Sequence, residues 1–139
     1  MGLFGSKPDI DRLKLTADFK GLVQALGNRD PTIRERAAEA LGNLRDDRAT
    51  DPLARALGDR DEIVRGRVIE ALARLGGPVA RKALTRAMGD EFIGNRERAR
   101  EAIARMIQQQ DEAKVFGLDP LEQKEEPPPF EPLRERDGR

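Results

Sequence analysis

The sequence predicts an all-α protein, an α-solenoid of three stacked helix pairs with capping helices at both ends. Three segments of the 139-residue chain align without a gap and recur every 31 residues: 22–44, 53–75 and 84–106. Within each segment the apolar residues follow the period of an α-helix. A single helix pair of this kind cannot cover its own apolar face, so neighbouring pairs must stack to form one core.

The front of the chain, residues 1–17, is predicted to be a lead-in with a capping helix. Pro8 to Leu15 is expected to form a short helix, with Ile10, Leu13 and Leu15 partly buried. Such a helix covers the first repeat, because the end of a stacked array needs a polar outer face. The repeat domain is assigned to residues 18–116, with units near 18–47, 48–77 and 78–110.

Each unit is predicted to contain a short first helix and a longer second one. The first helix ends at Gly27, Gly58 or Gly89, since a residue free to adopt positive φ ends a helix at little cost. Asp30-Pro31 then predicts an N-cap with proline at the first helical position, and the second helix runs to about Leu44. The links between units, 45–47 and 76–78, carry residues that favour turns.

The second helix of each unit carries one apolar stripe at helical spacing, which we expect to form the core. The stripe is Ile33, Ala37, Ala40, Leu41 and Leu44 in the first unit, and Val64, Val68, Ala71, Leu72 and Leu75 in the second.

The repeated pattern resembles HEAT repeats, most closely the short PBS-lyase-like kind. The residues that carry the resemblance are the short helix, the Gly-Asn/Asp-x-Asp turn and the Val/Ile-Arg-x-x-Ala-x-x-Ala-Leu run, over residues 18 to 107. The start, MGLFGSKPDIDRLKLTADFKGLVQAL, also resembles the lead-in of small prokaryotic HEAT-like proteins. The resemblance implies an Asp–Arg ladder in which Arg34 and Arg65 lie four residues after Asp30 and Asp61. Such a ladder pins the turn and links neighbours, and Arg96 is its third arginine.

The third unit departs from the pattern in its turn. Phe92 stands where the earlier units have the N-cap aspartate, and Asn95 stands where they have Ile33 and Val64. Two interpretations remain open. Phe92 and Ile93 either fold back as the cap of an end unit, or form an exposed apolar loop that contacts a partner.

The back of the chain is predicted to be a long helix followed by a tail. The helix is expected to run through Ile107 to about Val115, and Val115, Phe116, Leu118 and Leu121 are expected to cover the last repeat. Residues 117–139 form a charged, proline-rich tail that we expect to be disordered. Its Pro127, Pro128, Pro129 and Phe130 form either a docking motif or part of a solvated tail without a role.

The candidate interaction residues lie on the second helices, which line the concave face of a solenoid. Away from the apolar stripe they form three rows across the units, and the apolar Ile69 lies among them. The set is Arg36, Arg67 and Arg98; Glu39, Glu70 and Glu101; Asn43, Arg74 and Arg105; and Ile69. Arg and Glu three residues apart are neighbours on a helix. The rows are therefore either a self-neutralising solvated face or a recognition groove for a protein partner of mixed charge.

The amino-acid composition excludes several kinds of functional site. The chain has no Cys or His and one Ser, which excludes disulfides, zinc fingers and Ser–His or Cys–His nucleophile pairs. The 26 basic and 26 acidic residues cancel, and no apolar run is long enough for a membrane span. We expect a cytoplasmic, non-catalytic interaction module or scaffold for an unidentified protein partner, without a cofactor and without membrane attachment.

Two alternatives come from analogy with other HEAT-like proteins. One is an assembly factor or lyase-like subunit related to bilin-lyase HEAT proteins. The other is nucleic-acid binding, since some HEAT-like solenoids are DNA glycosylases. Nucleic acid is the less expected partner, because the chain is neutral and has no Trp or Tyr to stack on a base.

Overall fold

A computed structural model describes residues 7–115 of the chain, and every regular element in this range is a helix. The predicted all-α class is therefore confirmed. The helices are α1 (Ile10–Leu15), α2 (Phe19–Ala25), α3 (Pro31–Leu44), the 3₁₀ turn η1 (Asp47–Ala49), α4 (Thr50–Ala56), α5 (Glu62–Leu75), α6 (Gly77–Ala87) and α7 (Ile93–Val115).

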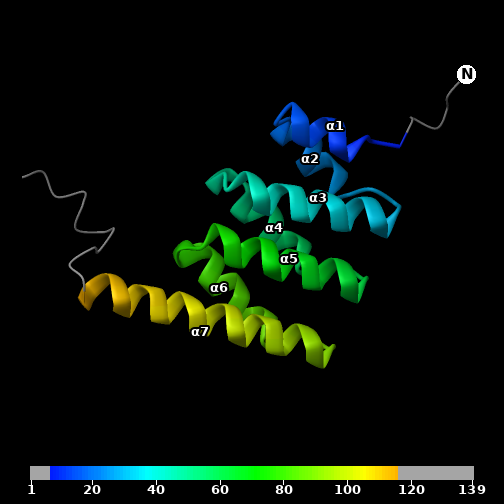
Figure 1. The fold of residues 1–139 in the computed structure, drawn as a ribbon. Coiled ribbons are helices and arrows are strands. Elements are labelled where there is room, and N and C mark those ends of the chain that lie inside the picture. Colours follow the sequence, from blue (N-terminus) through cyan, green and yellow to red (C-terminus); the bar gives the residue numbers. More distant parts are fainter. Residues whose placement is uncertain (1–6, 116–139) are drawn as a thin grey trace, which may run out of the picture. The chain divides into compact units, whose positions relative to one another are not determined.

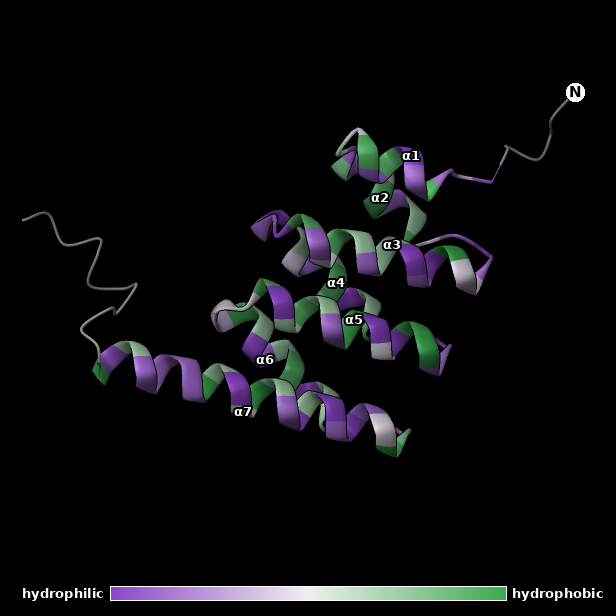
Figure 2. Ribbon diagram, viewed as in Figure 1, coloured by the Kyte–Doolittle hydropathy of each residue, from purple (hydrophilic) through white to green (hydrophobic). Residues whose placement is uncertain are grey.

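The helices pair and stack as an α-solenoid within the compact unit Met1–Ile107. Figure 1 shows α3, α5 and the first part of α7 side by side as one layer, with the short helices of each pair behind them. α3 packs most closely on α5, and α4 contacts both α5 and α6. Bands of hydrophilic and hydrophobic colour alternate along the long helices (Figure 2), as expected of helices that bury one side.

The core is built from leucines at fixed repeat positions with alanines between them. Leu22, Leu53 and Leu84 occupy the same position in the three units, and all three are fully buried. Leu41 and Leu72 are equally buried on the second helices. The predicted stripes are confirmed, although Leu44 and Leu75 at their ends are only partly buried. Small alanines allow the helices to approach closely, so aromatic residues are not needed to fill the interior.

The second helices of the first two units begin as predicted. The Asp30 carboxylate accepts a hydrogen bond from the Thr32 backbone N–H at 2.9 Å, and Asp61 accepts one from Ile63 at 2.8 Å. Both aspartates are therefore N-caps.

The expected reason for the glycines that end the first helices is wrong. Among the described glycines, only Gly76 and Gly77, in the link before α6, have positive φ. At Gly27, Gly58 and Gly89 the backbone N–H bonds instead to the carbonyl three residues earlier, which tightens the last turn.

The two ends of the described chain agree with the predictions in outline. α1 begins after the N-cap Asp9 and buries Ile10, but Leu15 is 89% exposed, so its expected burial is wrong. The described part of α7 reaches Val115, which is 80% exposed, so its expected burial over the last repeat is wrong. The compact unit ends at Ile107, within α7. The domain end at residue 116 and the cap formed by Phe116, Leu118 and Leu121 stay predictions, because residues 116–139 lie outside the described part.

Candidate interaction site

The Asp–Arg ladder links neighbouring units, but its partners differ from those expected. The Arg34 Nε donates to Asp59 Oδ2 of the next unit at 2.8 Å, and its Nη2 donates to Asp59 Oδ1 at 3.0 Å. Arg65 binds Asp90 in the same way, at 2.8 and 3.2 Å. The predicted pairing with Asp30 and Asp61 is wrong, because both carboxylates cap helices. The arginines cross instead to the turn of the following unit.

Each ladder arginine also bonds to its own turn. The Arg34 Nη1 donates to the Asn28 carbonyl at 2.8 Å, and the Arg65 Nη1 donates to the Asp59 carbonyl at 2.9 Å. Arg96 makes the equivalent bond to the Asp90 carbonyl at 2.9 Å. Within residues 7–115, Arg96 has no carboxylate partner, since it belongs to the last unit. The ladder is therefore structural, and it fixes the turns that carry the candidate site.

In the second pair of the ladder, Arg65–Asp90, electrostatic interactions favour the charged form of both side chains. Burial raises the pKa of the Asp90 carboxyl, but the hydrogen bonds from Arg65 and from the Phe92 backbone N–H outweigh it, so this pKa lies below its ordinary value. The bond to Asp90 also raises the pKa of the Arg65 guanidinium. Both groups are therefore ionised at neutral pH and hold the turn before α7 against α5.

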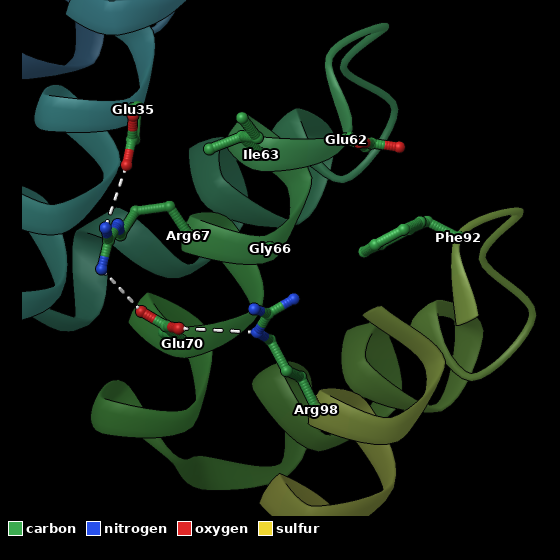
Figure 3. Close-up of a pocket in the computed structure, with 8 residues that line it drawn as sticks. All are labelled: Glu35, Glu62, Ile63, Gly66, Arg67, Glu70, Phe92 and Arg98. Atoms are coloured by element: carbon green, nitrogen blue, oxygen red, sulfur yellow. Dashed lines mark hydrogen bonds and ion pairs between the residues drawn. The ribbon is translucent and has the colours of Figure 1, made fainter. Parts of the chain in front are cut away.

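A groove of about 270 Å³ lies between α5 and the start of α7, on the layer of second helices (Figure 3). Its lining combines charged and apolar side chains. The lining residues are Glu35, Glu62, Ile63, Gly66, Arg67, Glu70, Phe92 and Arg98. Three of them, Arg67, Glu70 and Arg98, belong to the rows predicted from the sequence.

Arg67 is the best-paired charge in the groove. Its Nη2 donates to Glu35 Oε1 on α3 at 2.9 Å, and its Nη1 donates to Glu70 Oε2 at 2.9 Å. The bond to Glu35 raises the pKa of the Arg67 guanidinium above its ordinary value, with burial opposing the shift. Glu70 has a second, longer contact with Arg98, at 3.7 Å from the Arg98 Nε. The chain of charges therefore runs from α3 across α5 to α7.

The repeat pattern breaks at one position of the groove lining. Gly66 stands 31 residues after Glu35, and Arg98 stands 31 residues after Arg67. At the first junction the Glu35 side chain reaches Arg67, whereas at the second Gly66 has no side chain to offer Arg98. A Cβ atom added at Gly66 would lie 2.8 Å from Asn95 Oδ1 and 3.5 Å from Arg98 Nη1. The Cβ position of Gly66 is therefore filled by the Asn95 amide, and the glycine lets this amide pack against α5.

Two exposed apolar residues line the groove. Ile63, on the first turn of α5, is 61% exposed, and Phe92, in the turn before α7, is 39% exposed. Figure 3 shows the Phe92 ring directed toward α5. The ring passes over Gly94, where an added Cβ would lie 2.7 Å from the Phe92 Cε1 atom. Ile93 is also exposed, so of the two sequence interpretations the exposed apolar loop agrees better with the structure.

Asn95 is a buried polar link between the two walls of the groove. It is fully buried at the position of Ile33 and Val64, and its Nδ2 donates to the Glu62 carbonyl of α5 at 2.9 Å. Its Oδ1 accepts from the Arg98 Nη1 at 3.2 Å. The amide therefore explains why this unit has no apolar residue here, and it holds the Arg98 guanidinium at the groove.

The other predicted residues of the rows lie outside this groove. Arg36 pairs with Asp11 of α1 at 2.8 Å, Arg74 donates to Asn43 at 3.1 Å, and Arg105 contacts Glu101 at 3.5 Å. Glu39 is partly exposed on α3. Within the described residues, Arg67–Glu70 is the one Arg–Glu pair three residues apart that forms an ion pair.

Ile69 is a corrected prediction. It is 1% exposed and belongs to the core, so it is not available to a partner. The tail residues Pro127, Pro128, Pro129 and Phe130 lie outside the described part of the chain. Sequence reasoning also missed Glu35, Glu62, Ile63 and Gly66. The change from Glu35 to Gly66 at one repeat position was the available signal.

The described residues also line a cavity away from the groove. A second cavity of about 250 Å³ lies at the link before α6, and its charged lining residues, Asp47 and Asp51, are both acidic. Residues 7–115 contain no cluster of side chains able to hold a metal ion. None of their helices combines the length and the apolar character that crossing a bilayer requires.

Comparison with known proteins agrees with this architecture. The sequence profile of the family described as HEAT repeats matches residues 19–112. No curated protein sequence matches the chain significantly. HEAT repeats generally mediate protein–protein interactions. The repeat period, the stacked helix pairs and the profile match over most of the chain lead to one conclusion: the protein belongs to the HEAT-repeat family.

Proposed function

We propose that the protein is a non-catalytic interaction module that binds a segment of a protein partner in the groove between α5 and α7. The observation that carries this proposal is the lining of the groove. It brings the exposed Ile63 and Phe92 and the half-exposed Arg98 around one cavity. Aromatic and arginine side chains around a concave site are typical of the residues that dominate protein interfaces.

The two alternatives from the sequence have less support. Nucleic-acid binding needs cations free to meet phosphates, yet the Arg36 and Arg67 guanidinium groups each bind a carboxylate, at 2.8 and 2.9 Å. The lyase-like alternative rests on analogy of fold, and fold does not imply activity. The absence of catalysis stays a proposal.

Site-specific photo-cross-linking tests the proposed function. A benzophenone amino acid is placed at Ile63, in the groove, or at Thr85, an exposed position on α6, and each version is irradiated in cells that make the protein. A discrete cross-linked protein band is expected at position 63 and not at position 85. No band at position 63, or the same bands at both positions, contradicts the assignment of the groove as the interaction site.

A further inference from the structure

Arg98 indicates which charge the partner carries, if the groove is the interaction site proposed above. At the first junction Arg67 has two carboxylates at 2.9 Å, from Glu35 and Glu70. At the second junction the equivalent Arg98 has one carboxylate, Glu70, at 3.7 Å. Glu70 is already engaged by Arg67 at the shorter distance. Arg98 therefore lacks the close, cross-helix carboxylate that its repeat equivalent has.

A carboxylate placed on Arg98, as Glu35 is placed on Arg67, would lie in the groove. Gly66, which occupies the place of Glu35, lines the cavity, and the Arg98 guanidinium is directed toward it in Figure 3. The Arg98 side chain is 48% exposed, so a ligand can reach it from solvent. Glu62 is the remaining acid of the lining, and Figure 3 shows its carboxylate directed away from Arg98. The fork of Arg98 is thus held by Asn95 on one side and open on the other.

A ligand that enters the groove displaces water from Arg98 and from the Phe92 ring. Removing water from an arginine costs free energy unless an acceptor replaces it, and a carboxylate is the best geometric match to a guanidinium. Burying the Phe92 ring is favourable when an apolar side chain covers it. A basic side chain near Arg98 is disfavoured, because like charges repel.

We propose that the partner segment places an Asp or Glu carboxylate on Arg98, as Glu35 does on Arg67, and packs an adjacent apolar side chain against Phe92. The partner is therefore an acidic–apolar peptide segment rather than a basic one. Arg98 provides the charge recognition and Phe92 provides the apolar contact.

A random twelve-residue peptide library displayed on phage tests the proposal. Selection is run on the wild-type protein, and clones that also bind a repeat-restored variant are removed. That variant carries Gly66→Glu, Phe92→Asp and Asn95→Val, the residues found one unit earlier at positions 35, 61 and 64. The first junction already packs this combination, so the variant is expected to stay folded, which its circular dichroism and urea unfolding verify. If it does not fold, Arg98→Gln, changed at a half-exposed side chain, takes its place in the subtraction.

The outcomes separate this inference from the proposed function. Groove-dependent clones are those that bind the wild type and not the repeat-restored variant. If these clones are enriched in an acid next to an apolar residue, they support both the proposed function and this inference. Groove-dependent clones that are neutral or enriched in Lys and Arg overturn the inference and leave the proposed function standing. No groove-dependent clones, together with no cross-link at Ile63, contradict both.

A synthetic peptide from the enriched clones then tests Arg98 directly by fluorescence anisotropy. Arg98→Gln is expected to weaken binding about tenfold, since it removes a charge-assisted hydrogen bond at a partly exposed site. Replacing the acid of the peptide by its amide is expected to have the same effect, and the two changes together little more. Arg100→Gln, at an exposed arginine of the same helix outside the lining, is the matched control. Equal losses at both arginines contradict the proposal.

Discussion

Replacing Arg65 by glutamine tests whether the ladder holds the units together through its carboxylates. The side chains of Arg65 and Asp90 are 13% and 7% exposed, so the substitution leaves a nearly buried carboxylate without its partner. Breaking a buried pair in this way costs about 3 kcal/mol. Arg96→Gln is the matched control at the same repeat position. Its bonds go to the Asp90 and Glu91 carbonyls, and losing them costs about 1 kcal/mol.

Urea unfolding followed by circular dichroism measures both costs. With a slope of about 1.5 kcal/mol per molar urea, the midpoint is expected to fall by about 2 M for Arg65→Gln and by less than about 1 M for Arg96→Gln. Adding Asp90→Asn to Arg65→Gln is expected to recover part of the loss, because the unpaired charge is removed. Equal losses at both arginines refute the reasoning, since the bonds to the turn carbonyls would then explain the whole effect.

Three further predictions concern the Arg65–Asp90 pair and two close glycine contacts. The pKa of Asp90 lies below its ordinary value of 3.8, so the folded state binds its proton at lower pH than the unfolded state does. The stability that the charged form contributes is full above about pH 4 and is lost as pH falls through the folded pKa. The difference in unfolding free energy between wild type and Asp90→Asn is therefore expected to shrink from pH 7 to pH 2, and a constant difference contradicts the assigned ionisation. Gly42→Ala is expected to destabilise the fold by about 1 kcal/mol, because its Cβ would lie 2.8 Å from both Cα and Cβ of Ala71 and overpacking exceeds the gain in helix propensity. Urea unfolding measures this loss, and an unchanged midpoint for Gly42→Ala contradicts the close approach of α3 and α5 at this position. Gly94→Ala is expected to leave the urea midpoint unchanged or slightly raised but to move the Phe92 ring resonances in NMR spectra, because the added Cβ would lie 2.7 Å from the ring; unmoved resonances contradict the ring position.

The sequence predicts the helices and the core well because both depend on local periodicity. The burial of Ile69 could not be recognised from one stripe. A second helix buries one face against its own pair and another against the next unit, and Ile69 lies on the latter. The equivalent Ala38 is buried too, and its small apolar side chain was a usable clue. Comparing the two positions across units shows the second buried face, whereas a single helical wheel does not.

Contacts between units were the harder part to predict. Arg34 bonds to Asp59, which is 25 residues away, although Asp30 lies within the same turn region. Local spacing favours Asp30, but that carboxylate is occupied as an N-cap. The groove has the same origin, because its lining comes from α3, α5, the turn before α7 and α7 itself. Such a site depends on which residues face each other across a junction, and this becomes visible only when the units are stacked.

The departures from the repeat have two different physical causes. Arg100 stands at the position of the buried Ala38 and Ile69 and is exposed. An exposed charge at this position is what an end unit needs, since terminal repeats require a polar outer face. Gly66 is different because it lies in the second unit, inside the stack, where capping has no use for it. A glycine in a helix interior costs about 1 kcal/mol relative to alanine, and here it also removes the partner that Arg98 would otherwise have. Capping therefore accounts for Arg100, whereas the close packing of the buried Asn95 amide accounts for Gly66.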